Sequence, residues 1–128
     1  MYKITAEPIE ASAVLLDALE AESAGSVIIH CAVVREVADH TVTLHVSYSP
    51  LPGATEELEQ IGSDLKRKWH VEHVSLCRRT GRLALGDVIS VVGVSAARSK
   101  DAFGASQDAV ARLKQMKCIL KEEAFRPR

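Results

Sequence analysis

Apolar and polar residues alternate along several short stretches of this 128-residue chain. The clearest stretch is 41–49, where Val42, Leu44, Val46 and Tyr48 are separated by polar residues, with the period of two that is typical of a half-buried strand. Other apolar or extended runs predict further strands. These runs are residues 2–5, 27–35, 71–77, 88–94 and 118–125.

Three other stretches place apolar residues every three or four positions, as a helix with one buried face requires. They lie around residues 10–21, 58–69 and 101–117. In the second, Leu58, Leu65 and Trp69 share the apolar stripe, and in the third Phe103 does so, which predicts that both aromatic side chains lie in the core. Ser99 precedes the third stretch, and we expect it to be the N-cap of that helix.

The order of these elements predicts an α+β fold in which three helices lie to one side of antiparallel sheets. A polar turn at residues 36–40 separates two strands, so we expect residues 27–35 and 41–49 to pair as a hairpin. The length is common for one domain, and 47% apolar residues suffice for one core, which predicts a single domain over residues 1–128.

The composition of the chain bears on the cellular compartment in which the protein works. The longest apolar run, residues 88–97, is far shorter than the roughly 20 residues of a membrane span, and the N-terminus lacks the pattern of a signal peptide. Cys31, Cys77 and Cys118 are odd in number and far apart, which favours neither a disulfide framework nor a zinc ribbon. We therefore expect a cytoplasmic protein in a reducing compartment, without contact to a membrane.

Charge is divided unevenly between the two halves. Residues 1–64 hold 11 acidic and 2 basic residues, a net charge of −9, whereas residues 65–128 hold 6 and 14, a net charge of +8. Either the basic half faces an anionic partner or substrate, or the two halves neutralise each other in a dimer. Nucleic acid is not favoured as the partner, because no aromatic residue is interleaved among the C-terminal lysines for base stacking.

Several cations stand where predicted elements end. Lys114, Lys117 and Lys121 lie beside or just past the third helix, and Arg35 and Arg98 each end a strand. Because strand ends and helix ends meet at the rim of such a fold, these side chains could converge on a phosphate or carboxylate. From spacing alone, solvated charges on a helix face are the simpler explanation.

A metal site is not favoured by the histidines of the chain. His70 and His73 are three residues apart, and such a step on a strand places the two rings on opposite faces. No third ligand is nearby in the sequence. We therefore expect neither a metal nor another cofactor.

Several separated segments follow the order and spacing of one known family. They are residues 25–35, Tyr48 with Pro52, residues 79–87, residues 92–94 followed by 102–105, and Lys114 with Lys121. Through them the chain resembles the MoaE family, the large catalytic subunits of molybdopterin synthase. The likeness extends over nearly the whole chain from residue 25 onward.

This resemblance implies a fold, an activity and partners. The fold would include an α/β hammerhead. The protein would be a sulfurtransferase of molybdenum-cofactor biosynthesis that converts precursor Z, a cyclic pyranopterin phosphate, into the dithiolene molybdopterin. Sulfur would arrive as a thiocarboxylate at the C-terminus of a small ubiquitin-like subunit, whose tail enters a pocket of the large subunit. Two large subunits would form a homodimer with a small subunit at each end, giving a heterotetramer.

The resemblance also implies catalytic residues. Lys114 and Lys121 match the two lysines of the family's active site. They would hold the tail and the oxyanion of the tetrahedral intermediate, and either could pass a proton. Glu122 or Glu123 would orient Lys121.

A second group of residues would bind the substrate. Val33, Val34 and Arg35 would offer backbone and guanidinium donors to its phosphate. Arg98 and Ser99 stand where the family has a His-Arg pair at the substrate pocket, and Arg98 would restore the positive charge.

The chain departs from the family pattern at other positions. A further His-Arg pair is Arg78-Arg79 here, and Cys118-Ile119-Leu120 replaces a Pro-x-Trp segment. These departures leave an alternative function open, in which a catalytically impaired paralogue keeps the fold and acts as a dimeric binding or scaffold protein.

Overall fold

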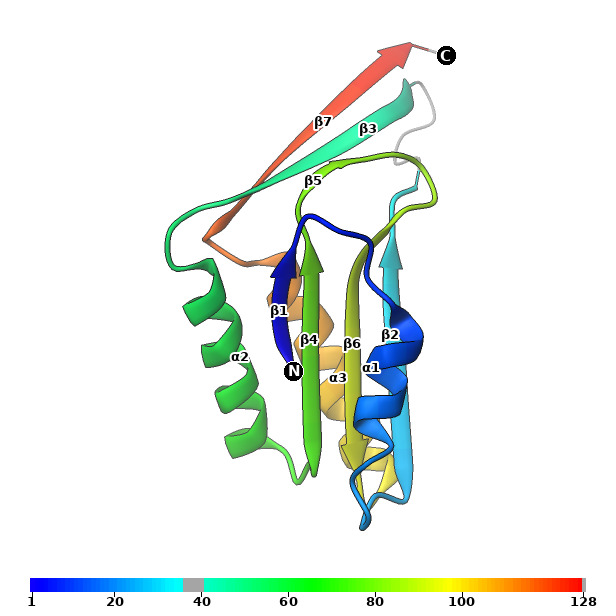
Figure 1. Cartoon of the computed structure of the whole chain (residues 1–128), viewed down its shortest axis with the longest axis vertical. Coiled ribbons are helices and arrows are strands. Elements are labelled where there is room, and N and C mark those ends of the chain that lie inside the picture. The colour runs from blue at the N-terminus through cyan, green and yellow to red at the C-terminus, as the bar shows by residue number, and fades with distance from the viewer. Residues whose placement is uncertain (36–40, 128) are drawn as a thin grey trace.

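The computed structural model describes residues 1–35 and 41–127, which form two sheets and three helices (Figure 1). The larger sheet has the strand order β1 (Tyr2–Thr5), β4 (His73–Arg79), β6 (Val88–Ala96) and β2 (Ser26–Val33). The smaller sheet has the order β5 (Gly81–Leu83), β3 (Thr41–Pro50) and β7 (Ile119–Pro127). The helices are α1 (Ala11–Ala18), α2 (Ala54–Lys68) and α3 (Ser99–Lys114). The predicted α+β class is confirmed, and the described strand pairings are antiparallel except for β1 with β4.

Helices cover both faces of the larger sheet. α1 lies on one face, and α2 and α3 lie on the other (Figure 1). Along β6, Val92 and Val94 join the core beneath α2 and α3, whereas Val91 packs with Val14 and Cys77 beneath α1. The prediction that all helices lie to one side is therefore wrong, because successive apolar residues of the central strand are buried on opposite faces.

The predicted hairpin of residues 27–35 and 41–49 is also wrong. β2 pairs with β6, while β3 pairs with β5 and β7, so the two strands belong to different sheets. Alternation of apolar residues determines which face of a strand is buried, but it does not specify the neighbouring strand. The polar turn predicted at residues 36–40 lies outside the described residues.

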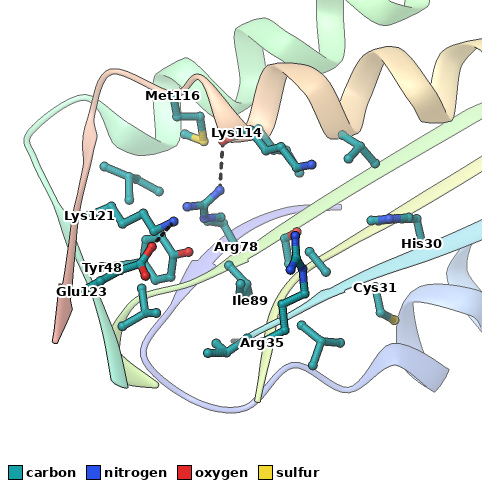
Figure 2. A pocket seen from close by; sticks show the side chains of 18 residues that line it. His30, Cys31, Arg35, Tyr48, Arg78, Ile89, Lys114, Met116, Lys121 and Glu123 are labelled. Atoms are coloured by element: carbon teal, nitrogen blue, oxygen red, sulfur yellow. Dashed lines mark hydrogen bonds and ion pairs between the residues drawn. The ribbon is translucent and has the colours of Figure 1, made fainter. Parts of the chain in front are cut away.

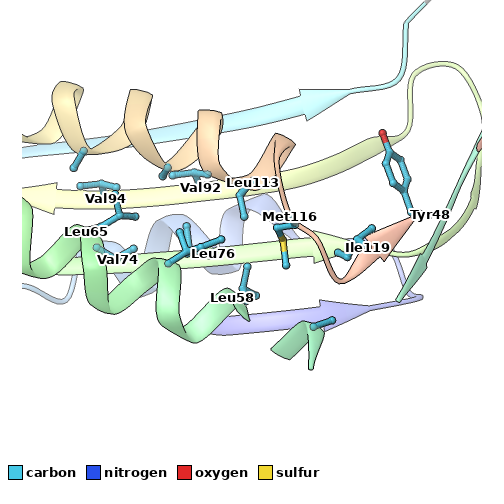
Figure 3. Packing of buried hydrophobic residues seen from close by; sticks show 14 of the residues in the cluster. Tyr48, Leu58, Leu65, Val74, Leu76, Val92, Val94, Leu113, Met116 and Ile119 are labelled. Carbon is cyan, nitrogen blue, oxygen red and sulfur yellow. The ribbon is translucent and has the colours of Figure 1, made fainter. Parts of the chain in front are cut away.

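The main core fills the space between the larger sheet and the pair of helices α2 and α3 (Figure 3). Leu58 and Leu65 of α2 belong to it together with Leu76 of β4 and Leu113 of α3, and none of these four is more than 2% exposed. Full burial of each such side chain contributes roughly 2 kcal/mol. Tyr48 of β3 extends the cluster, so the same core holds the smaller sheet against the larger one.

The two aromatic residues that the helical pattern placed in the core have different surroundings. Trp69 follows α2 and packs against the main core, as predicted. Phe103 is 62% exposed, which is a correction, because the buried face of α3 is built from smaller residues. The N-cap of α3 is Arg98 and makes no side-chain capping bond, so Ser99 is the first residue of the helix rather than its cap.

A close contact joins α2 to α3 at Gly104. The Trp69 ring lies over this glycine, and its Nε1 donates a hydrogen bond to Asp108 Oδ2 at 3.0 Å. A Cβ at position 104 would lie 2.3 Å from Cζ3 of the ring. Because the hydrogen bond and the core hold the ring, glycine is the residue that allows the two helices to pack.

We expect Gly104→Ala to destabilise the protein, because displacing the Trp69 ring costs about 1–3 kcal/mol and outweighs the roughly 1 kcal/mol by which alanine favours a helix. Urea unfolding measures the change, and Gln107→Ala on the exposed side of α3 is the matched control. Adding Trp69→Leu should remove most of the penalty. A Gly104→Ala protein as stable as the parent would contradict the close contact.

Candidate functional site

A cavity of about 630 Å³ lies at the junction of the two sheets. Its walls come from β2 and the residues after it, β3, β4, β6, the C-terminal end of α3 and β7. The apolar part of the lining includes Val34, Val46, Ile89, Leu113, Met116 and Ile119. Among the described residues, the cationic part consists of Arg35, Arg78, Lys114 and Lys121, which surround one hollow in Figure 2.

The pairing of β3 with β7 builds one wall of this cavity. Tyr48 stands opposite Lys121, and Val46 stands opposite Glu123. Because side chains alternate along a strand, all four share the face that lines the cavity. Lys121 Nζ lies 2.7 Å from Glu123 Oε1, so Glu123 is the carboxylate placed to orient Lys121. Glu122 is exposed and is not part of the lining.

The opposite wall carries Arg35. β2 is irregular between Ala32 and Val33, and such a bulge redirects the residues that follow it. Val34 is buried, its N–H donates to Asp87 O at 3.0 Å, and its carbonyl accepts from Gly86 N at 2.9 Å. Val34 therefore cannot donate its backbone N–H to a phosphate, contrary to the sequence-based expectation. It forms an apolar wall, and the cation of this segment is Arg35.

Helix α3 separates two groups of predicted site residues. Lys114 is its last residue, at the end where the helix dipole favours a cation, and lines the cavity. Arg98 and Ser99 lie at its beginning, about 22 Å away along the helix axis. Neither lines the cavity of its own chain, so their predicted role in substrate binding would require a second copy.

Arg78 lines the cavity, although sequence reasoning did not select it as a site residue. It is 7% exposed, its Nη1 donates to Leu113 O at 2.9 Å, and its guanidinium carbon lies 4.7 Å from the centre of the Tyr48 ring. Burial lowers the pKa of Arg78 below its ordinary value. In the sequence, Arg78 directly follows the apolar residues Leu76 and Cys77. Because a buried arginine in a strand is rare, this position was the signal by which the sequence could have indicated a site residue.

Three buried polar atoms of the cavity lining lack a hydrogen-bond partner in the described part of the chain. They are His30 Nδ1, Arg78 Nε and Glu123 Oε2. Such atoms are uncommon in folded proteins, since each loses its hydration without compensation. Arg78 Nε–H needs an acceptor and Glu123 Oε2 needs a donor, so the lining is suited to a ligand that carries both.

Polar residues outside the cavity form hydrogen bonds that hold elements of the fold together. His73 Nε2 lies 2.7 Å from Asp17 Oδ2, and Ser75 Oγ donates to the same oxygen at 2.9 Å, which ties α1 to β4. Burial alone would raise the pKa of Asp17, but the hydrogen bonds from Ser75 and His73 outweigh it and lower this pKa. Within residues 1–35 and 41–127, no group of His, Cys, Asp and Glu side chains is suited to a metal ion. In the same residues no helix is long and apolar enough to cross a membrane.

Fold and cavity together define an α+β protein of two sheets and three helices with a cationic cavity between its sheets. The MoaE protein family model matches residues 4–116, and the chain belongs to this family. A relative from Halalkalibacterium halodurans named molybdopterin synthase catalytic subunit is 32% identical over 123 residues, covering 95% of this chain and 78% of the relative. A protein of the same name from Bacillus subtilis is 30% identical over 125 residues, covering 97% and 79%.

The likeness extends to the three-dimensional structure. The crystal structure of molybdopterin synthase from Staphylococcus aureus matches this fold with a TM-score of 0.89 and 29% identity, covering 98% of this chain and 91% of that chain. The family resemblance found in the sequence is thereby confirmed.

We expect inorganic sulfate to bind in the cavity and to raise the melting temperature. At about five times its Kd, sulfate would add about 1 kcal/mol of stability, equivalent to a few degrees in Tm. Lys114→Ala and Lys121→Ala should reduce this gain, whereas Lys117→Ala, an exposed lysine outside the lining, should leave it unchanged. Equal gains in all three variants would show that the cavity does not bind the anion.

Proposed function

We propose that this chain is the catalytic subunit of a molybdopterin synthase, an enzyme of molybdenum-cofactor biosynthesis. In this reaction sulfur passes from the C-terminal thiocarboxylate of a small ubiquitin-like subunit to precursor Z. The observation that carries the proposal is the convergence of Arg35, Lys114 and Lys121 on one cavity, in a chain whose relatives bear this name.

The two lysines would stabilise the negative charge that develops on the acyl oxygen. The thiocarboxylate sulfur would first bond to an oxygen-bearing carbon of the pterin substrate as the bond from that carbon to its oxygen breaks, and the departing oxygen would take up a proton and leave as water or stay on the phosphate. Water then attacks the acyl carbon, the carbon–sulfur bond to the tail breaks, and the tail leaves as a carboxylate. The attack places negative charge on the acyl oxygen, which Lys114 and Lys121 would neutralise. Glu123, 2.7 Å from Lys121 Nζ, would keep that ammonium group in position.

Arg35 would bind the phosphate of the pterin, because a guanidinium presents paired N–H donors to phosphate oxygens. The apolar walls of the cavity would exclude water from the pterin ring. Arg98 and Ser99 would contribute to this pocket from the second subunit of a homodimer. The cytoplasm, where thiols stay reduced, is the setting that suits a thiocarboxylate donor.

We expect Lys114→Ala and Lys121→Ala each to lower the rate of dithiolene formation by about 10²- to 10³-fold, because each removes a group that stabilises the oxyanion. The assay mixes the protein with precursor Z and the thiocarboxylated small subunit. Lys117→Ala is the control and should retain nearly full activity.

The intact chain could also fail to form any product under conditions in which the Bacillus subtilis catalytic subunit is active. That result would contradict the proposed activity and would favour a binding protein of the same fold.

A further inference from the structure

A buried arginine with an unused donor lies where the lysines of the cavity meet the smaller sheet. Arg78 Nη1 is occupied by Leu113 O at 2.9 Å, and the Tyr48 ring covers the guanidinium at 4.7 Å. The Nε atom is buried and has no partner in the described residues. Because Nε–H and the adjacent Nη2 form one edge of the planar fork, that edge is suited to donate two parallel hydrogen bonds to one oxyanion.

Glu123 Oε2, which has no hydrogen-bond partner among the residues that the structure describes, belongs to the same corner of the cavity. Glu123 contacts Lys121, Lys121 stands opposite Tyr48, and the Tyr48 ring stacks on Arg78. The corner thus offers an N–H that needs an acceptor and a carboxylate oxygen that needs a donor. The end of an extended peptide carries both within about one residue length of roughly 3.3 Å, namely its terminal carboxylate and the last backbone N–H. A phosphate group supplies acceptors and no N–H donor.

We propose that Arg78 is a specificity residue that binds the C-terminal carboxylate, or thiocarboxylate, of the incoming peptide tail, while Glu123 accepts a hydrogen bond from the tail's last N–H. This assignment rests on the proposed function and adds to it a residue that recognises the free end of the tail. Lys114 and Lys121 act on the acyl oxygen as charge develops, whereas Arg78 selects a tail that ends in an anion. Figure 2 shows Arg78 below Lys114, with Lys121 and Glu123 on one side of it and Arg35 on the other.

The test uses two synthetic peptides that end in Gly-Gly, one with a free carboxylate and one with a C-terminal amide. We expect the intact protein to bind the carboxylate peptide about tenfold to hundredfold more tightly, the range of a charge-assisted fork contact. Arg78→Gln should reduce this ratio to near one. Arg78→Lys, which keeps the charge and lacks the fork, should give an intermediate ratio.

A second measurement does not depend on the variants folding. The ¹⁵Nε–¹Hε resonance of Arg78 in the intact protein, assigned by through-bond correlations to its own backbone in ¹³C,¹⁵N-labelled protein, should shift when the carboxylate peptide binds. It should shift much less with the amide peptide or with inorganic phosphate.

The outcomes separate this assignment from the function on which it rests. If the intact protein forms dithiolene product but binds the two peptides equally, Arg78 does not read the carboxylate, and the proposed function stands. If phosphate shifts the Arg78 resonance and the carboxylate peptide does not, the oxyanion is the phosphate of the substrate, and the assignment to the tail is wrong. If neither peptide binds and no product forms, the proposed function fails together with the assignment.

Discussion

The antiparallel pairing of β3 with β7 is the constraint on which the candidate site depends. It brings a strand from the middle of the chain against its C-terminal end, with Tyr48 opposite Lys121. Joining segments about seventy residues apart costs loop-closure entropy, which the burial of Val46, Tyr48 and Ile119 helps to offset. Strand alternation then places Lys121 and Glu123 on the cavity side. Without this pairing, Lys121 would be an ordinary solvated lysine.

Burial strengthens the interactions that Arg78 can make with an anion. Arg78 keeps one hydrogen bond, to Leu113 O, and an aromatic contact, while its Nε lacks a partner within the described chain. The cost of burying such a cation is recovered when an anion pairs with it, since charge interactions are stronger at low dielectric. Lys114 and Lys121, at the more exposed rim, would attract anionic ligands before they reach Arg78.

The uneven distribution of charge along the sequence has an explanation within one chain. Acidic residues of the first half pair with groups of the second: Asp64 Oδ2 lies 2.8 Å from Arg112 Nη1, and the Glu57 carboxylate accepts the backbone N–H groups of Lys117 and Cys118, both at 2.8 Å. Part of the separation is therefore neutralised by folding. Lys114 and Lys121 line the cavity, and an anionic ligand there was one of the two explanations considered for the sequence.

The local pattern of the sequence was enough to predict most helices and strands of this protein and to indicate its family. Local spacing identified the three helices and each described strand except β5, and the separated segments up to Lys114 and Lys121 indicated the MoaE family, because each of these signals is carried by residues close to one another in the sequence. Tertiary structure alone decided the pairing of β2 with β6, the exposure of Phe103, the use of the Val34 N–H by Asp87 and the place of Arg78 in the cavity. These features depend on which distant surfaces are buried together, and no local periodicity encodes that choice.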